Sequence, residues 1–104
     1  MAAFRAVTAA SRAEILRLDS TFVRAWLRDD TAGVLGVFAA DAVLQPPGAP
    51  AVTGLAAIRA YWWPDDGSHT KITDFDWTVE ELTGTPQLAF SRGISTVAWR
   101  YQKD

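Results

Sequence analysis

Three carboxylates, those of Asp74, Asp76 and Glu80, share one face of a segment whose polarity alternates with a period of two residues. Two neighbouring carboxylates raise the pKa of one member of the pair, so they can act together as acid and base. The opposite face carries Phe75 and Trp77, and the apolar face of a half-exposed antiparallel strand points inward. We therefore favour a solvated or dimer-facing surface for these carboxylates over a catalytic group.

Two further side chains could transfer protons. His69 is the only imidazole of the chain and can act as a general base near neutral pH, but it lies in the loop-like run DDGSHT. A mobile loop holds catalytic geometry poorly, so we favour a solvated histidine unless the loop covers the mouth of a pocket. Asp41 lies between a helix-like and a strand-like segment, where aspartate commonly binds nearby backbone amides, and we favour that structural role.

Two arginines could bind an anionic substrate. Arg92 and Arg100 share a face of the strand-like segment 88–101 with apolar side chains. A guanidinium that reached a cavity would offer a fork of donors to an anion. For both residues we prefer an exposed position, or pairing with carboxylates at the strand edge.

Gln45 could orient a ligand or a water molecule inside a pocket, because its amide both donates and accepts hydrogen bonds. In a strand, either Val43 and Gln45 or Leu44 and Pro46 face the interior. The adjoining prolines make the local backbone irregular, so both orientations stay open.

The N-terminal half of the chain has the periodicity of helices. The run SRAE, residues 11–14, has the form of a capping box in which Ser11 is the cap. An apolar stripe at helical spacing follows it and predicts a helix from about Arg12 to Arg28. Asp29 and Asp30 interrupt the stripe and can cap a short second helix, which two glycines weaken.

The remaining segments predict strands and one more helix. Residues 42–45 form a short strand that the run PPG ends, and 51–53 form a brief return strand. The run TGLAAIRAYWW predicts a third helix that Thr53 caps and Pro64 ends. Two long strands, 70–82 and 88–101, flank a turn at 83–86, with a bulge or bend at Gly93. Helices followed by long antiparallel strands are typical of an α+β fold.

Composition limits the classes of function. The 104 residues suffice for one domain, 1–104, of which we expect 1–10 to be flexible. The net charge of −2 is spread along the chain without a basic stripe, which argues against nucleic acid as a partner. The absence of cysteine and the single histidine exclude disulfides and thiol chemistry and argue against a zinc site. Neither a membrane span nor a secretory signal is evident, so we expect a soluble cytoplasmic protein.

These elements, in this order, resemble the SnoaL-like and ketosteroid-isomerase-like branch of the nuclear-transport-factor-two-like superfamily. The resemblance rests on VRAWLRDD, on the following GVLGVFAADAVLQPPGAPAVTGLAAIRAYWW, and on LAFSRG. It implies a curved antiparallel sheet wrapped around three helices as a cone, with an apolar pocket at the open end. The residues expected to form that pocket, or the core behind it, are Phe22, Trp26, Phe38, Leu44, Gln45, Pro46, Trp62, Trp77 and Trp99.

The sequence departs from the catalytic pattern of ketosteroid isomerases. Those enzymes combine a carboxylate base with an oxyanion hole made by a tyrosine and a protonated aspartic acid. Here the resemblance places Pro46 at the position of the base and Phe22 at that of the tyrosine, and neither side chain can transfer a proton. The third group has no counterpart that the sequence identifies.

A second departure concerns the sheet. Family members return a final strand after a segment like AWRYQKD, which ends this chain, so the resemblance implies an open sheet edge. Such an edge exposes unpaired backbone groups and invites pairing with another chain. We expect a homodimer, formed through the outer sheet face as is common in the family or through this edge.

Three functions remain open at this point. The first is binding of a small hydrophobic molecule, without a cofactor or metal. The second is an enzyme, such as an isomerase, cyclase or hydrolase, whose acid and base lie at other positions. The third is a non-catalytic dimerisation module.

Overall fold

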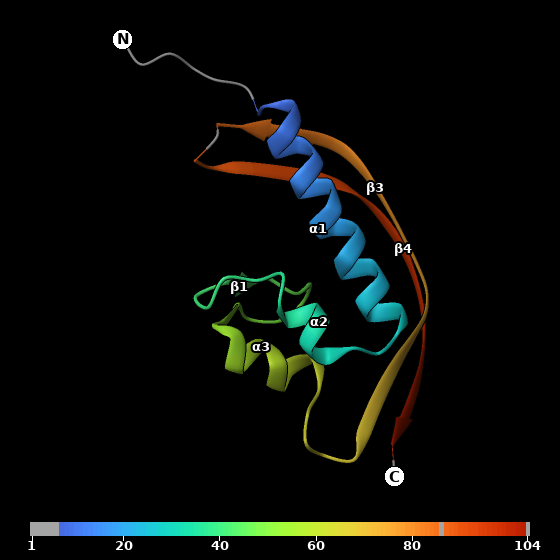
Figure 1. Ribbon diagram of the computed structural model, residues 1–104. Helices are drawn as coiled ribbons and strands as arrows, with labels where there is room; N and C mark the ends of the chain where they lie inside the picture. The colour runs from blue at the N-terminus through green and yellow to red at the C-terminus, as the bar shows by residue number, and fades with distance from the viewer. Residues whose placement is uncertain (1–6, 86, 104) are drawn as a thin grey trace.

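The computed structural model describes residues 7–85 and 87–103 and confirms an α+β fold with three helices. A long curved hairpin of β3 and β4 holds α1 on its concave side, and the shorter elements gather beside the C-terminal half of α1 (Figure 1). In chain order the elements are α1 (Ala9–Leu27), α2 (Thr31–Leu35), β1 (Val43–Leu44), β2 (Val52–Thr53), α3 (Leu55–Trp62), β3 (Ser68–Gly84) and β4 (Ala89–Lys103).

Helix α1 begins earlier than the sequence indicated. Thr8 is the N-cap, and its hydroxyl accepts a hydrogen bond from the amide of Ser11 at 3.1 Å. The prediction that Ser11 caps the helix is therefore wrong, because the good helix formers Ala9 and Ala10 extend it backward to a threonine that satisfies the same orphan amides. Part of the segment expected to be flexible is thus helical, whereas residues 1–6 lie outside the described residues.

The turn between α1 and α2 confirms the predicted role of the aspartate pair. Asp29 adopts the left-handed conformation, with φ of 58°, and Asp30 caps α2 by accepting a hydrogen bond from the amide of Gly33 at 3.0 Å. A Cβ at position 33 would lie 2.5 Å from Oδ2 of Asp30. This glycine therefore leaves room for the cap, besides lowering the intrinsic stability of the helix.

Strands β1 and β2 pair antiparallel, with Val43 opposite Thr53. Thr53 was expected to cap α3, but its place in the ladder prevents this, and Gly54 precedes the helix with φ of 89°. Pro64 follows the end of α3 as predicted. Within the described ranges, no helix is both long and apolar enough to cross a membrane.

The hairpin of β3 and β4 is longer than the predicted strands. His69, expected in a loop, lies in β3 and pairs with Gln102, because β4 extends far enough to hold it. The predicted turn at 83–86 begins later, since β3 runs to Gly84 and the amide of Thr85 bonds the carbonyl of Leu88. Residue 86 lies outside the described residues.

The bulge or bend expected at Gly93 lies instead in the facing strand, β3, whereas β4 continues without interruption. The register shifts between Val79 and Glu81, directly beside the pair formed by Val79 and Gly93. A Cβ on Gly93 would lie 2.1 Å from the carbonyl oxygen of Thr78. Glycine at this position therefore allows the two strands to approach where the ladder is irregular.

The core is small and lies at one end of the molecule. Among the described residues, the buried apolar side chains are Ala25, Trp26, Val34 and Ile58. Partly buried aromatic rings surround Trp26, and we refer to the whole as the aromatic cluster: Phe22, Trp26, Phe38, Trp62, Trp63 and Phe75. The accessible surface of 7518 Å² exceeds the roughly 5,800 Å² of a compact 11.4 kDa protein, so much of the chain is open to solvent.

Candidate functional site

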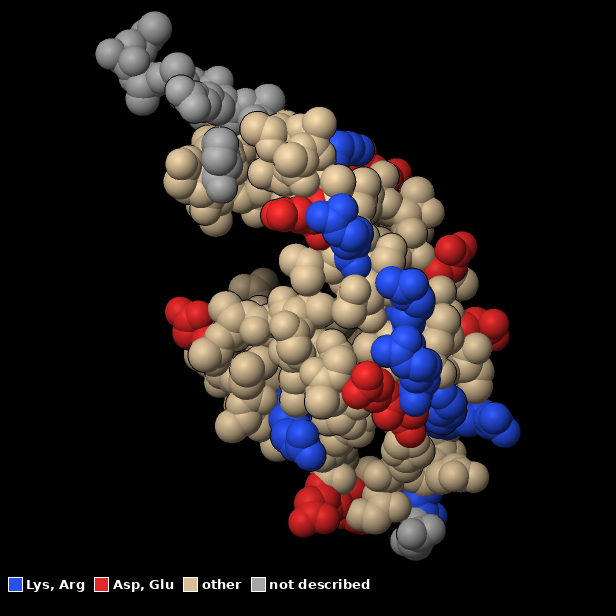
Figure 2. Space-filling model, viewed as in Figure 1, with Lys and Arg blue, Asp and Glu red and all other residues tan. Residues whose placement is uncertain are grey.

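A hollow lies between α1 and the inner face of the hairpin. It has a volume of about 260 Å³ and is lined by Asp19, Phe22, Val23, Phe75, Trp77 and Ser95. A wider groove of about 640 Å³ shares four of these residues and continues along α1 and β3. A third hollow, of about 350 Å³, lies between α1 and the segment that follows α2. The space-filling view shows the molecule indented between the N-terminal end of α1 and the lobe of α2 and α3 (Figure 2).

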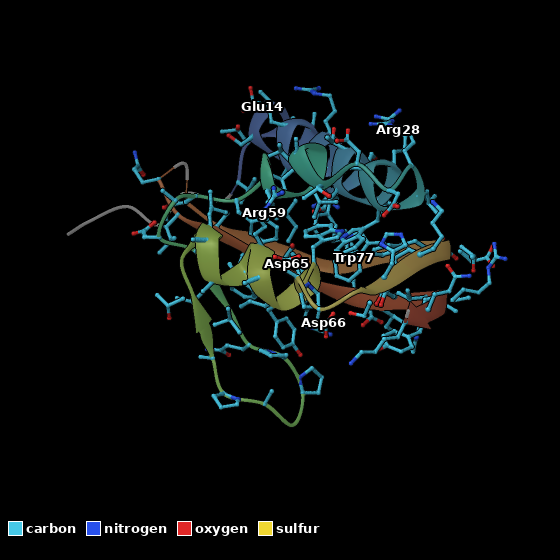
Figure 3. All side chains as sticks on the ribbon, turned by 90° about the horizontal axis from the view of Figure 1, so that it is seen from below. Glu14, Arg28, Arg59, Asp65, Asp66 and Trp77 are labelled. Carbon is cyan, nitrogen blue, oxygen red and sulfur yellow. The ribbon has the colours of Figure 1, made fainter. Side chains whose placement is uncertain are left out.

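Asp19 borders all three hollows and is the carboxylate common to them. It is partly buried, and its Oδ2 accepts a hydrogen bond from Nε1 of Trp77 at 3.3 Å. The two residues come from the middle of α1 and the middle of β3, so this bond joins the two walls of the hollow. Side chains crowd around Trp77 between helix and strands, whereas Glu14 and Arg28 point away from that interior (Figure 3).

The sequence analysis missed Asp19, although a signal for it was present. Ile15, Asp19 and Phe22 follow one another at spacings of four and three residues, which is the spacing of one helix face. A carboxylate at a position of the apolar stripe is unusual, because burial of a charge without a partner is unfavourable. Such a residue is therefore a candidate for a role in a site.

The aromatic cluster closes the hollow at the end nearest α3. The ring of Phe22 contacts those of Phe38 and Phe75, with centroids 5.7 and 6.0 Å apart. Trp26 stacks on Trp63 at 4.9 Å, with 14° between the ring planes. These contacts fix the rings that form the floor of the hollow and leave Phe22 and Phe75 to line it.

The residues expected in the pocket thus occupy different positions. Phe22 and Trp77 line the hollow, whereas Trp26 and Trp62 pack behind it in the aromatic cluster. Phe38 also belongs to that cluster and borders the third hollow. Trp99 stands apart: it lies opposite Ile72 in the ladder and remains 61% exposed.

In β1 and the residues that follow it, the side chains that face inward are those of Leu44 and Pro46. Both are partly buried, whereas Val43 and Gln45 are exposed. None of these four residues is among those that line the three hollows. The structure therefore does not bring Pro46 and Phe22 to one shared hollow.

The carboxylates of β3 lie on the exposed side of the strand. Asp74, Asp76 and Glu80 are exposed, although Asp76 also borders the wider groove. Arg92 binds Glu80 and Glu81 at 3.3 and 3.0 Å, the pairing with carboxylates that we preferred for this arginine. Charged groups on this face thus interact with one another across the hairpin.

The other two catalytic candidates lie outside the hollow. Nε2 of His69 contacts Oδ2 of Asp29 at 2.8 Å, and this contact ties β3 to the turn between α1 and α2. Asp41 is exposed beyond α2. Arg100 is exposed and borders a small surface hollow together with His69, Lys71 and Gln102.

One carboxyl of the described residues has a clearly displaced pKa. The hydroxyl and the amide of Ser68 both donate to Asp66, and these hydrogen bonds lower the pKa of that carboxyl below its usual value of 3.8. The pair fixes the backbone where the loop after α3 enters β3. Asp66 is exposed and is not among the residues that line the hollow, so its pair with Ser68 is a structural contact.

Comparison with known proteins gave matches to a solved structure and to a family model. A solved structure from Catenulispora acidiphila, determined at 2.35 Å in complex with S-DNPA, has a TM-score of 0.49 and 17% sequence identity, with 90% of this chain and 81% of that chain covered. No curated protein matches the chain. A family model described as a SnoaL-like domain matches residues 20–102, which is most of the sequence. The chain therefore belongs to the SnoaL-like domain family.

Proposed function

We propose that the domain binds a small, largely apolar organic molecule in the hollow between α1 and the β3–β4 hairpin. The proposal rests on one observation: a concave space of about 260 Å³, joined to a wider groove, is lined mainly by Phe22, Phe75, Trp77 and Val23. Small-molecule sites are typically concave and apolar, with few polar groups that orient the ligand. In this proposal the curved hairpin acts as the wall of a cone that wraps around the helices.

Asp19 supplies the polar group of this site. One of its oxygens binds the indole of Trp77, so the other can accept a hydrogen bond from a ligand. Within the described ranges, no lysine, arginine or histidine nitrogen lies within 4.0 Å of this carboxylate. The ligand therefore carries a donor, either a hydroxyl or an ammonium group, and the aromatic faces around it favour the ammonium.

Catalysis is a second candidate function, and the position of the Asp19 carboxylate at the hollow favours it. An aspartate at the edge of an apolar hollow can act as general acid or base, provided that a substrate places its proton within hydrogen-bond reach. If the domain is an enzyme, the side chain that transfers protons is Asp19 on α1, and not a residue of β1. The catalytic candidates on β3 play no part in it.

We also propose that two copies of the domain associate. This is supported by the apolar side chains that β4 leaves open to solvent, including Ile94 and Trp99, which are 60% and 61% exposed. Apolar surface of this kind on a strand marks a site of interaction.

Three adamantane derivatives of nearly equal shape test the binding proposal: 1-adamantylmethanol, 1-adamantylmethylamine and 1-adamantanecarboxylate. None absorbs where tryptophan does, so indole fluorescence reports binding directly. We expect saturable changes with the alcohol and the amine, tighter binding of the amine, and none with the carboxylate, which Asp19 repels. The indole NH signal of Trp77 should shift in the NMR spectrum during the same titrations.

The matched controls are Asp19→Asn and Glu14→Gln, both on α1. The first should remove the preference for the amine, while the second, on the exposed face of the helix, should leave all three affinities unchanged. If none of the probes moves the Trp77 signal at millimolar concentration, the binding proposal is wrong.

A further inference from the structure

Strand β4 has an edge that no other strand covers. It pairs with β3 along one side, and within residues 7–85 and 87–103 no strand is hydrogen-bonded to the other side. Four apolar side chains of β4 are more than half exposed: Phe90, Ile94, Trp99 and Tyr101. A long edge with exposed apolar side chains is a template for pairing with another strand.

The side chains of β4 are distributed in an unusual way along its inner face. Ser95 pairs with Trp77, which lines the hollow, so the residues at even spacing from Ser95 share that inner face. The register shifts lie in β3, and β4 itself continues without interruption. On one side of Ser95 the inner face carries only small residues, Ala89, Ser91 and Gly93, and on the other side the large residues Val97, Trp99 and Tyr101.

We infer that a second copy of the chain pairs with this edge, antiparallel, with the two-fold axis at Ser95. This inference rests on the proposed association and specifies its surface and register. Antiparallel pairing about Ser95 places each large residue opposite a small one: Val97 faces the partner's Gly93, Trp99 faces the partner's Ser91, and Tyr101 faces the partner's Ala89. Because directly opposite side chains lie about 4.5–5.5 Å apart, this complementarity of size lets the two strands meet without a gap or a clash.

The charges are compatible with this register and disfavour the one next to it toward the C-terminus. With the axis at Ser95, Arg100 lies opposite the partner's Phe90, where a guanidinium can contact the aromatic ring. Arg92 then faces the partner's Ala98 and keeps its contacts with Glu80 and Glu81. Moving the axis by one residue, to Thr96, would place Arg92 directly opposite the partner's Arg100, and like charges directly opposite one another are destabilising.

Stable interfaces bury about 800 Å² on each partner, and the exposed apolar side chains of β4 would contribute to that area. The pairing would join the two hairpins into one continuous four-stranded sheet, with both copies of α1 on the same face.

Single cysteines test the register directly, because the chain contains no cysteine of its own. In the Ser95→Cys variant the two cysteines face each other across the axis, with a Cα separation within the range that a disulfide spans. We expect mild oxidation to convert this variant to a covalent dimer on a non-reducing gel. The matched control is Ser91→Cys, on the same strand and face, whose two copies would lie about 27 Å apart and should stay unlinked.

Size-exclusion chromatography with light scattering separates the possible failures. A wild-type dimer in which Ser91→Cys links as fast as Ser95→Cys would overturn the register and leave the association intact. A wild-type chain that remains monomeric at 100 μM or above, with no Ser95→Cys dimer, would overturn both. Ligand binding in the hollow is measured independently and does not depend on either result.

Discussion

Tryptophan occupies two opposite environments in this domain. Trp26, in α1, is 8% exposed and packs within the aromatic cluster, with Ala25 and Val34 fully buried beside it. Trp99, in β4, is 61% exposed. The difference arises because side chains from three helices and β3 converge on Trp26, whereas Trp99 lies toward the C-terminal end of β4, where the described residues leave most of its ring open to solvent.

This contrast separates a region that stabilises the fold from a region that is available for contact with another molecule. The region around Trp26 supplies the stability of the fold, because burial of apolar area is the dominant favourable term. The apolar residues of β4 contribute little to the isolated chain and are available for contact with another molecule. The hollow beside Asp19 lies between the two regions and takes its rigid floor from the first.

The largest expected effect separates these two tryptophans. Trp26→Ala should destabilise the protein by about 3–5 kcal/mol, because it removes a buried indole and leaves a cavity. Trp99→Ala should change the free energy of unfolding of the monomer by about 0.5 kcal/mol or less, since the ring is largely solvated already. Urea denaturation at low protein concentration measures both values. Equal losses from the two substitutions would contradict the division described above.

A substitution in the hairpin sharpens the comparison. Gly93→Ala should cost about 1–3 kcal/mol, because the added methyl group meets the carbonyl of Thr78 and the ring of Trp77. Ser91→Ala, on the same strand and face, should be nearly neutral and serves as the control. Thermal unfolding followed by circular dichroism compares the two variants. A neutral Gly93→Ala would show that the strands can separate at this point without loss of stability.

Ligand binding in the hollow can be measured separately from the stability of the fold. Asp19→Asn should weaken binding of 1-adamantylmethylamine about tenfold, because a charge-assisted hydrogen bond becomes a neutral one. Binding of 1-adamantylmethanol should change much less, since an amide oxygen still accepts from its hydroxyl. Fluorescence titration gives both affinities. Equal weakening of the two probes would point to a structural change in the hollow rather than to lost recognition of charge.

The smallest expected effect lies at the start of β3. Ser68→Ala removes the hydroxyl that donates to Asp66, so the pKa of that carboxyl should rise toward 3.8. Because the folded-state pKa is lowered, the stabilising contribution of the pair is present above 3.8 and disappears as the pH falls through the folded-state pKa. An NMR titration of the Asp66 carboxyl measures the change, with Thr70→Ala as a control that should leave it in place.

The periodicity of the sequence identified most of the fold. The apolar stripe around Phe22 and Trp26 predicted α1 and its buried face, and alternation predicted β3 with Phe75 and Trp77 turned inward. These predictions succeeded because each depends on a local pattern whose period matches the backbone. The cap by Asp30 followed from the conformational preference of a single residue, and Gly93 marked the level of the bulge although the extra residue belongs to β3.

Predictions that depend on long-range contacts were less complete. Alternation assigns Trp99 to a face of β4, but whether anything covers that face depends on neighbours that a local pattern does not reveal. His69 was assigned to a loop because the residues around it do not reveal how far β4 extends. In the structure β4 is long enough for Gln102 to pair with His69. Asp19 was overlooked because a single acidic residue in an apolar stripe acquires meaning only when Trp77 is known to lie opposite.

The stacked indoles of Trp26 and Trp63 have a spectroscopic consequence. Two chromophores with nearly parallel planes, 4.9 Å apart, couple their electronic transitions and produce paired circular dichroism bands of opposite sign. One ring belongs to α1 and the other to the residue that follows α3, so the contribution of this pair disappears when the two helices separate. The indoles of Trp26, Trp62 and Trp63 therefore supply an intrinsic optical signal for the docking of α1 against α3, which stopped-flow refolding can follow in real time.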